Sequence, residues 1–174
     1  MASSPDDLED PSPNAGPRYS PVASLPMLRD FRPGDQDALR RLILDGLRER
    51  WAEAFDATVN PDLSDFVANY LDRGAEIVVI ESHGDIIATG TLIAGDDAAG
   101  RILRMSVSVS HRRQGLARHV VEELVRRARR RGMSEVRVLT DTPWTRAVEL
   151  YAACGFTEVR RDATDTHFVL PLRA

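Results

Sequence analysis

One stretch of the chain has the pattern of a long amphipathic helix between two strands, and it constrains the fold more than any other feature. Apolar residues recur about every four positions from residue 116 to residue 128, which places them along one face of a helix. The segments before and after it, residues 102–109 and 136–139, are rich in aliphatic and β-branched residues and predict strands. Two strands joined through a helix normally pair in parallel. The sequence therefore predicts an α/β protein with one parallel crossover.

Further helices and strands are predicted on both sides of this unit. Their ranges are 35–51, 61–71 and 142–155 for the helices, and 27–31, 76–81, 86–93, 158–161 and 167–172 for the strands. Thr142 is the expected N-cap of the last helix, with Pro143 at its first position. Short polar turns separate the strands between residues 76 and 109, which favours antiparallel pairing there. We therefore expect a mixed, mostly antiparallel central sheet of about six to seven strands, flanked by four helices.

The chain has 174 residues, enough for one domain with some excess. Six of the ten prolines fall within the first 26 residues, so a disordered tail is predicted for 1–26 and a single domain for 27–174. The single cysteine, Cys154, predicts neither a disulfide nor a cysteine-based metal site. No apolar run is long enough to span a membrane, and the acidic N-terminus lacks the pattern of a secretory signal. These features predict a cytoplasmic protein without a membrane partner.

All 23 basic residues are arginine, which excludes mechanisms that need a lysine nucleophile or the lysine of a P-loop. Ten of these arginines fall between residues 101 and 131. The formal net charge is nevertheless −4, so no nucleic acid partner is predicted. Glu123 and Arg127 are spaced as an i,i+4 pair on the side opposite the apolar stripe, and the arginines from 126 to 131 are expected to be mostly solvated.

The turn before the long helix has the composition of an anion-binding site. A helix N-terminus presents unpaired N–H groups and a partial positive charge. Gly115 lets the backbone approach a ligand closely, and Arg112, Arg113 and Arg118 add positive charge. The pattern predicts a phosphate or pyrophosphate cradle. The alternative is a tight turn that only starts a basic surface helix.

Two motifs in this part of the chain resemble those of the GNAT superfamily of acyl-coenzyme A-dependent N-acetyltransferases. The first is Arg112-Arg113-Gln114-Gly115-Leu116-Ala117, and the second is Leu150-Tyr151-Ala152-Ala153-Cys154-Gly155-Phe156. The resemblance covers about residues 27–172 and implies the GNAT fold. It also implies acetyl-coenzyme A as the cofactor and direct transfer of its acetyl group, in a ternary complex, to the primary amine of a small molecule or peptide.

The resemblance assigns roles to individual residues. The backbone of Val107 and Val109 would hold the pantetheine arm in the manner of an added strand. The cofactor's pyrophosphate would be bound by the turn and first helical residues, which are Arg112, Arg113, Gln114, Gly115, Leu116, Ala117 and Arg118. Trp144 stands where many members have an asparagine and would pack against the arm, unless it is a core or helix-start aromatic. Tyr151 would donate a proton to the departing thiolate, unless it is a core tyrosine.

Several points stay open at this stage. Glu81, His111 or a water molecule could act as the general base, since Arg101 occupies the place of a glutamate found in some relatives. Residues 44–76 carry a balance of −5, which favours a cationic amine acceptor, although a solvated helix face has the same composition. A non-catalytic GNAT-like sensor or scaffold that binds acyl-coenzyme A is the alternative function, and a homodimer is an alternative to a monomer.

Overall fold

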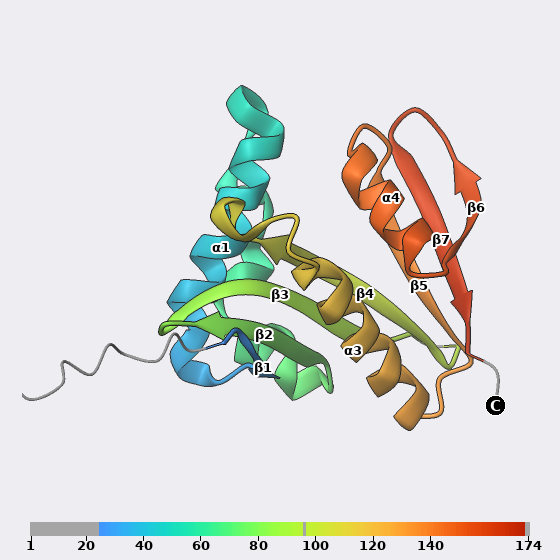
Figure 1. The fold of residues 1–174 in the computed structure, drawn as a ribbon, viewed down its shortest axis with the longest axis horizontal. Coiled ribbons are helices and arrows are strands. Elements are labelled where there is room, and N and C mark those ends of the chain that lie inside the picture. The colour runs from blue at the N-terminus through green and yellow to red at the C-terminus, as the bar shows by residue number, and fades with distance from the viewer. Residues whose placement is uncertain (1–24, 96, 173–174) are drawn as a thin grey trace, which may run out of the picture.

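The computed structural model describes residues 25–95 and 97–172 (Figure 1). The predicted tail over 1–26 lies almost entirely outside these residues, so both it and the single domain over 27–174 stay predictions. No helix in the described ranges is long and apolar enough to cross a membrane.

The predicted α/β class is confirmed, with seven strands in one sheet and four α-helices. The strands are β1 (Met27–Asp30), β2 (Glu76–Ser82), β3 (Asp85–Ala94), β4 (Ala99–Val107), β5 (Glu135–Asp141), β6 (Thr157–Arg161) and β7 (Asp165–Pro171). The helices are α1 (Gln36–Trp51), α2 (Phe66–Asn69), α3 (Leu116–Arg130) and α4 (Thr145–Ala153). In the sheet the strands follow the order β1-β2-β3-β4-β5-β7-β6.

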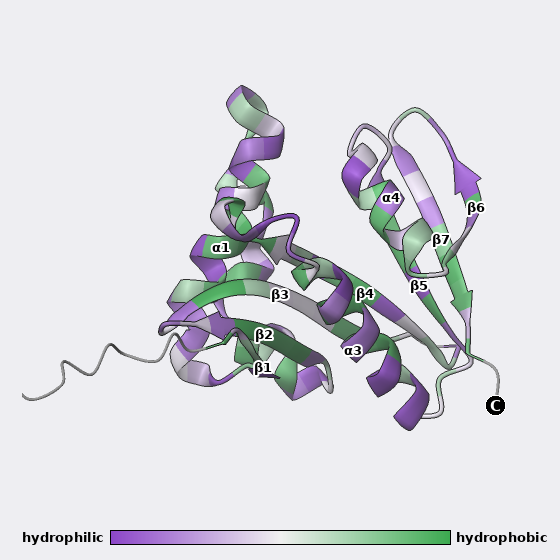
Figure 2. Cartoon of the chain, in the orientation of Figure 1, coloured by the Kyte–Doolittle hydropathy of each residue, from purple (hydrophilic) through white to green (hydrophobic). Residues whose placement is uncertain are grey.

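Helices cover both faces of the first four strands. Along β2, alternate residues point to opposite faces: Val78 and Ile80 pack in a core with α3, whereas Ile77 and Val79 pack in a second core with α1 and α2. Figure 2 shows the strands between these layers as largely hydrophobic, while the outer side of α3 is hydrophilic. The ends of α1 and α3 therefore reach the sheet from opposite sides.

The crossover through α3 produces the one parallel pair of the described sheet, between β4 and β5. This pairing is short and covers only Ala99–Ile102 with Glu135–Val138. Beyond these residues the two strands diverge, as Figure 1 shows. Nearby, β4 contains a bulge opposite Gly90 of β3, and Arg104 within it has a φ of 54°. The divergence opens a gap in the middle of the sheet that side chains from several elements line.

The predicted helix over 61–71 is wrong. The segment instead forms a 3₁₀ turn at Pro61–Ser64, the four-residue α2, and a second 3₁₀ turn at Leu71–Arg73. Asp65 interrupts it in an extended conformation, and its carboxylate accepts a hydrogen bond from the Ala68 N–H as the N-cap of α2. A capping residue in the middle of an apolar pattern therefore divides one predicted helix into short pieces.

Two predicted element boundaries are also wrong. Helix α4 begins at Thr145 with Trp144 as its N-cap, so Pro143 precedes the helix instead of occupying its first position. The hydroxyl of Thr142 donates to the Asp162 carbonyl and does not cap α4. Strand β4 ends at Val107, so Val109 belongs to the 3₁₀ turn that follows the strand.

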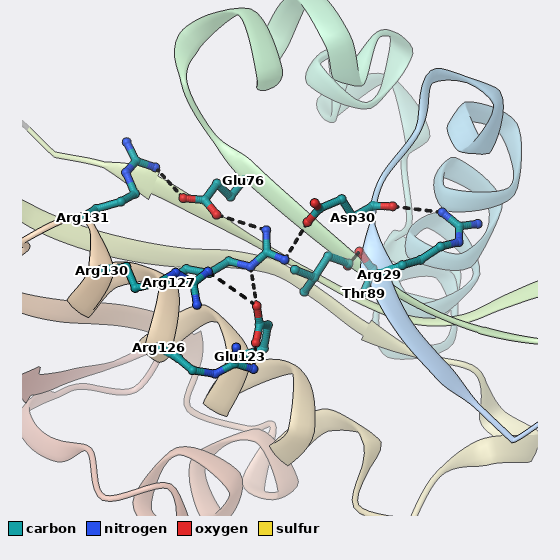
Figure 3. Close-up of polar contacts among 10 residues, drawn as sticks. Arg29, Asp30, Glu76, Thr89, Glu123, Arg126, Arg127, Arg130 and Arg131 are labelled. Atoms are coloured by element: carbon teal, nitrogen blue, oxygen red, sulfur yellow. Dashed lines mark hydrogen bonds and ion pairs between the residues drawn. The ribbon is translucent and has the colours of Figure 1, made fainter.

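A buried ion network joins α3 to the first two strands (Figure 3). Arg127, whose side chain is only 12% exposed, pairs with Glu123 at 2.6 Å, Glu76 at 3.0 Å and Asp30 at 2.6 Å. Glu123 is buried and also pairs with Arg126. The i,i+4 pair between Glu123 and Arg127 is thus confirmed, but its predicted position on a solvated face is wrong.

Candidate functional site

A cavity of about 810 Å³ lies where β4 and β5 diverge. Its walls come from the end of α1, the second half of β4, the turn before α3, the start of α3, the end of β5 and the start of α4. Most of the predicted site residues line it, namely Val107, Arg112, Arg113, Gly115, Leu116, Ala117, Arg118, Trp144 and Tyr151. Gln114 is not among the lining residues, and Val109 is 67% exposed outside the cavity.

The turn at the start of α3 forms a cradle of backbone donors. Arg113 and Gly115 both have positive φ, at 64° and 79°, which turns the chain sharply into the helix. The first intrahelical bond comes from the His119 N–H to the Gly115 carbonyl. The backbone N–H groups of residues 113–118 have no acceptor within the described residues. Such a row of unpaired donors fits a diphosphate.

Two of the arginine side chains beside the cradle, those of Arg112 and Arg118, are bound to carboxylates. Arg112 forms a bidentate pair with Glu49 of α1, at 2.7 and 2.6 Å, and its Nε also donates to the Val107 carbonyl. This guanidinium holds the pKa of the Glu49 carboxyl below its usual range. Arg118 pairs with Glu122 one turn along the helix. Backbone N–H groups are therefore the main donors of the cradle.

Tyr151 lies on α4 against the floor of the cavity. Its ring contacts Phe156 and Phe168, at centroid distances of 5.8 and 5.9 Å, and the residue is only 5% exposed. Burial raises the pKa of the phenol, and the positive charge of Arg50 offsets part of this rise. The phenol is therefore protonated at neutral pH and can donate a proton into the cavity.

The indole of Trp144 is part of a cation–aromatic stack at the cavity wall. The guanidinium of Arg50, at the end of α1, lies 4.1 Å from the centre of the Trp144 ring. Trp51 contacts the same ring edge-on, with centroids 5.9 Å apart. Desolvation lowers the pKa of Arg50, which remains a cation. The sequence predicts a cofactor contact for Trp144 but no role for Arg50, because nothing in the local pattern of α1 places Arg50 beside α4.

The two side chains that the sequence offers as the general base lie in different places. Glu81 is bound to Arg29, at 2.6 Å, and does not line the cavity. His111 lines the cavity and its Nδ1 lies 2.9 Å from the Ser110 hydroxyl. Asp141, for which the sequence predicts no role, also lines the cavity, at the C-terminal end of β5. Desolvation raises its pKa. The sequence feature that could have pointed to Asp141 is its place at the C-terminal end of a strand that pairs in parallel, because ligand-binding crevices form at such strand ends.

The acidic residues between positions 44 and 76 do not form an acidic wall. Asp62 pairs with Arg104 and Asp45 pairs with Arg48, while Glu76 belongs to the ion network of α3. Glu49 is the one carboxylate of this stretch that lines the cavity, and it is bound to Arg112. The surplus of negative charge in the sequence is therefore not concentrated at the cavity.

Comparisons with known sequences bear on the identity of this domain. The family model of the acetyltransferase (GNAT) family matches residues 37–156. N-acetyltransferase 8 of Rattus norvegicus is 33% identical over 138 residues, which cover 70% of this chain and 62% of the relative. The chain therefore spans less than two thirds of the length of that protein.

Solved structures share the fold. An acetyltransferase of the GNAT family from Staphylococcus aureus Mu50 matches with a TM-score of 0.78 at 18% identity, covering 86% of this chain and 100% of the other. The PaiA N-acetyltransferase of Thermoplasma acidophilum, solved in complex with coenzyme A, matches with a TM-score of 0.75 at 13% identity and the same coverage. With the family match over most of the described domain, the chain belongs to the acetyltransferase (GNAT) family.

Proposed function

We propose that the protein transfers the acetyl group of acetyl-coenzyme A directly to a primary amine, with both substrates bound at once. The observation that carries this proposal is one cavity that connects the backbone cradle at residues 113–118 with the protonated phenol of Tyr151. The cradle suits the diphosphate of the cofactor, and the phenol suits the sulfur end. The divergence of β4 from β5 leaves the intervening wall open for an extended arm.

The cofactor side of the cavity provides backbone contacts. The N–H groups of residues 113–118 would donate to the phosphate oxygens, and the absence of a side chain at Gly115 leaves that approach open. The half of β4 that does not pair with β5, up to Val107, would bind the pantetheine arm like an added strand. Trp144 would pack against the same arm from α4.

The chemistry requires two proton transfers. The cofactor supplies an acetyl thioester, an activated acyl group. As the amine nitrogen bonds to the acetyl carbon and the carbon–sulfur bond breaks, the amine gives up a proton and Tyr151 gives its own to the departing sulfur. Asp141, His111 or a water molecule in the cavity would take the proton of the amine, which then returns to the phenol through solvent.

The alternative is a GNAT-fold sensor that binds acyl-coenzyme A without turnover. The position of Tyr151 favours catalysis, because this residue lines the cavity and its hydroxyl donates to no other residue that the structure describes. The test is an assay of free thiol release from acetyl-coenzyme A with a panel of primary amines, checked by mass analysis of the acetylated products. We expect turnover above the amine-free background. Tight binding of coenzyme A without turnover on any amine would contradict catalysis.

A further inference from the structure

We infer that the acceptor is a primary amine that also carries a carboxylate, and that Arg50 binds this carboxylate. The inference rests on the proposed acetylation of amines and adds a class of acceptor to it. It replaces the cationic acceptor suggested by the acidic balance of residues 44–76, since Glu49 is the one acid of that stretch that lines the cavity and it is bound to Arg112.

Arg50 is held at the cavity wall by packing and not by an acid. It belongs to the last turn of α1, and its guanidinium stacks on Trp144, which is itself in contact with Trp51. No carboxylate among the described residues lies within ion-pair distance of it. Its positive charge nevertheless acts on both Tyr151 and Asp141. A cation fixed in this way presents its N–H groups to a ligand.

The other arginines of the cavity differ from Arg50. Arg104, Arg112 and Arg118 each form an ion pair with Asp62, Glu49 and Glu122, respectively. Arg113 has no such pair within residues 25–95 and 97–172, but it belongs to the phosphate cradle. Arg146, which also has none there, stacks on no aromatic ring among the described residues. Arg50 alone in this set stacks on an aromatic ring of the cavity wall, and its charge also acts on Tyr151.

The cavity also holds a negative charge, the carboxylate of Asp141. Asp141 lines the same space and is half-buried, and it forms no ion pair with any residue that the structure describes. A cation and a half-buried carboxylate that line one cavity without pairing with each other can each bind an oppositely charged ligand group. A molecule with a carboxylate for Arg50 and an amine for the side of Asp141 and Tyr151 meets both needs.

Arg50 and the phosphate cradle belong to different helices, although Glu49, the neighbour of Arg50, pairs with Arg112 in the turn before the cradle. The cradle lies at the N-terminus of α3, which packs on one face of the sheet, whereas α1 packs on the other face. A role in holding coenzyme A would appear as a loss of cofactor affinity when Arg50 is replaced. A role in the acceptor site would appear as a loss of acceptor selectivity.

The experiment compares matched acceptors that differ only in the carboxylate: alanine with ethylamine, leucine with isopentylamine, and phenylalanine with phenethylamine. For each pair, kcat/KM is measured with acetyl-coenzyme A for the wild type and for Arg50→Met, Arg50→Lys and Arg48→Met. Arg48 lies on the same helix, outside the cavity, and serves as the matched control. Binding to the coenzyme A-loaded protein is followed in parallel by fluorescence of the two tryptophans, both of which line the cavity.

We expect the wild type to prefer the carboxylate member of at least one pair by about 10- to 100-fold, the range of a hydrogen-bonded charge pair. Arg50→Met should bring this ratio close to one, Arg50→Lys should keep part of it, and Arg48→Met should keep it all. Equal use of both members by the wild type, an unchanged ratio in Arg50→Met, or a loss confined to coenzyme A affinity would overturn the inference.

The binding measurement separates this inference from the proposed function. If no amine is acetylated but the carboxylate members still bind more tightly, and Arg50→Met removes the difference, the proposed catalysis fails and the inference stands. If neither turnover nor binding distinguishes the members of any pair, the inference fails whatever the outcome for catalysis.

Discussion

The burial of Tyr151 determines what this residue can contribute. Its hydroxyl makes no hydrogen bond to another described residue, so Tyr151→Phe removes a proton donor and little packing. If the phenol protonates the departing sulfur, kcat should fall about 100-fold, the lower range for general acid catalysis. The affinity for coenzyme A should stay the same, because the cradle is at another part of the cavity. Steady-state kinetics and tryptophan fluorescence measure the two quantities.

The pH profile provides a second check on the same residue. Burial raises the pKa of Tyr151, so the phenol keeps its proton through the neutral and moderately alkaline range. The wild-type rate should therefore show no descending limb at about pH 10, the ordinary range of tyrosine. A limb at that pH that Tyr151→Phe abolishes would mean that the phenol has an ordinary pKa. Full activity of Tyr151→Phe at every pH would remove Tyr151 from the reaction.

At the scale of the element, the two ends of α3 offer a matched pair of glycines. Gly115 before the helix and Gly132 after it have φ values of 79° and 68°, and an added Cβ would meet no atom within 4 Å at either position. Valine should therefore cost about 1–3 kcal/mol of stability at both positions, through backbone strain alone. Only Gly115→Val should also lower coenzyme A affinity, by more than about tenfold, because its side chain would enter the phosphate cradle.

Thermal unfolding and coenzyme A titration of both variants measure these effects. The Gly132→Val variant controls for strain, since it lies at the far end of the helix from the cradle. Equal affinity for coenzyme A in the two variants would show that residues 113–118 do not bind the cofactor. An undisturbed stability in both would show that the helix ends adapt to a β-branched residue.

The elements also show what the sequence can predict. The apolar period of α3 and the β-branched content of its flanking strands are local features, and the parallel crossover that they predict is confirmed. The predicted helix over 61–71 is wrong because Asp65 serves as a cap inside it. The cradle follows a local turn, so the sequence can predict it, and its binding of a phosphate stays a prediction. Arg50 and Asp141 instead reach the cavity through the tertiary packing of α1 and β5 against α4. The apolar periodicity of a single helix or strand does not show which distant element packs beside it.

At the scale of the whole molecule, arginine is both the source of positive charge and a structural residue. The chain has no lysine, and its arginines were expected to be largely solvated between residues 126 and 131. In the structure, Arg127 joins α3 to β1 and β2, and Arg131 contacts Glu76 and the Gly74 carbonyl. Arginine suits such a position because its planar head has five N–H donors for several acceptors at once. Part of the basic cluster therefore holds the fold together.

The last prediction concerns this network. Arg127→Met keeps the aliphatic stem but leaves Glu123, whose side chain is 5% exposed, with less compensating charge. Loss of one partner from a buried ion pair should lower the free energy of unfolding by about 3 kcal/mol. Arg129→Met, on an exposed position of the same helix, should change the free energy of unfolding by less than about 0.5 kcal/mol.

In the double variant Glu123→Gln/Arg127→Met the loss of stability should be smaller than the sum of the losses in Glu123→Gln and Arg127→Met, because no buried charge is left unpaired. Urea unfolding of the wild type, the single variants Glu123→Gln, Arg127→Met and Arg129→Met, and the double variant measures these values. An Arg127→Met variant as stable as Arg129→Met would show that the ion network adds no net stability.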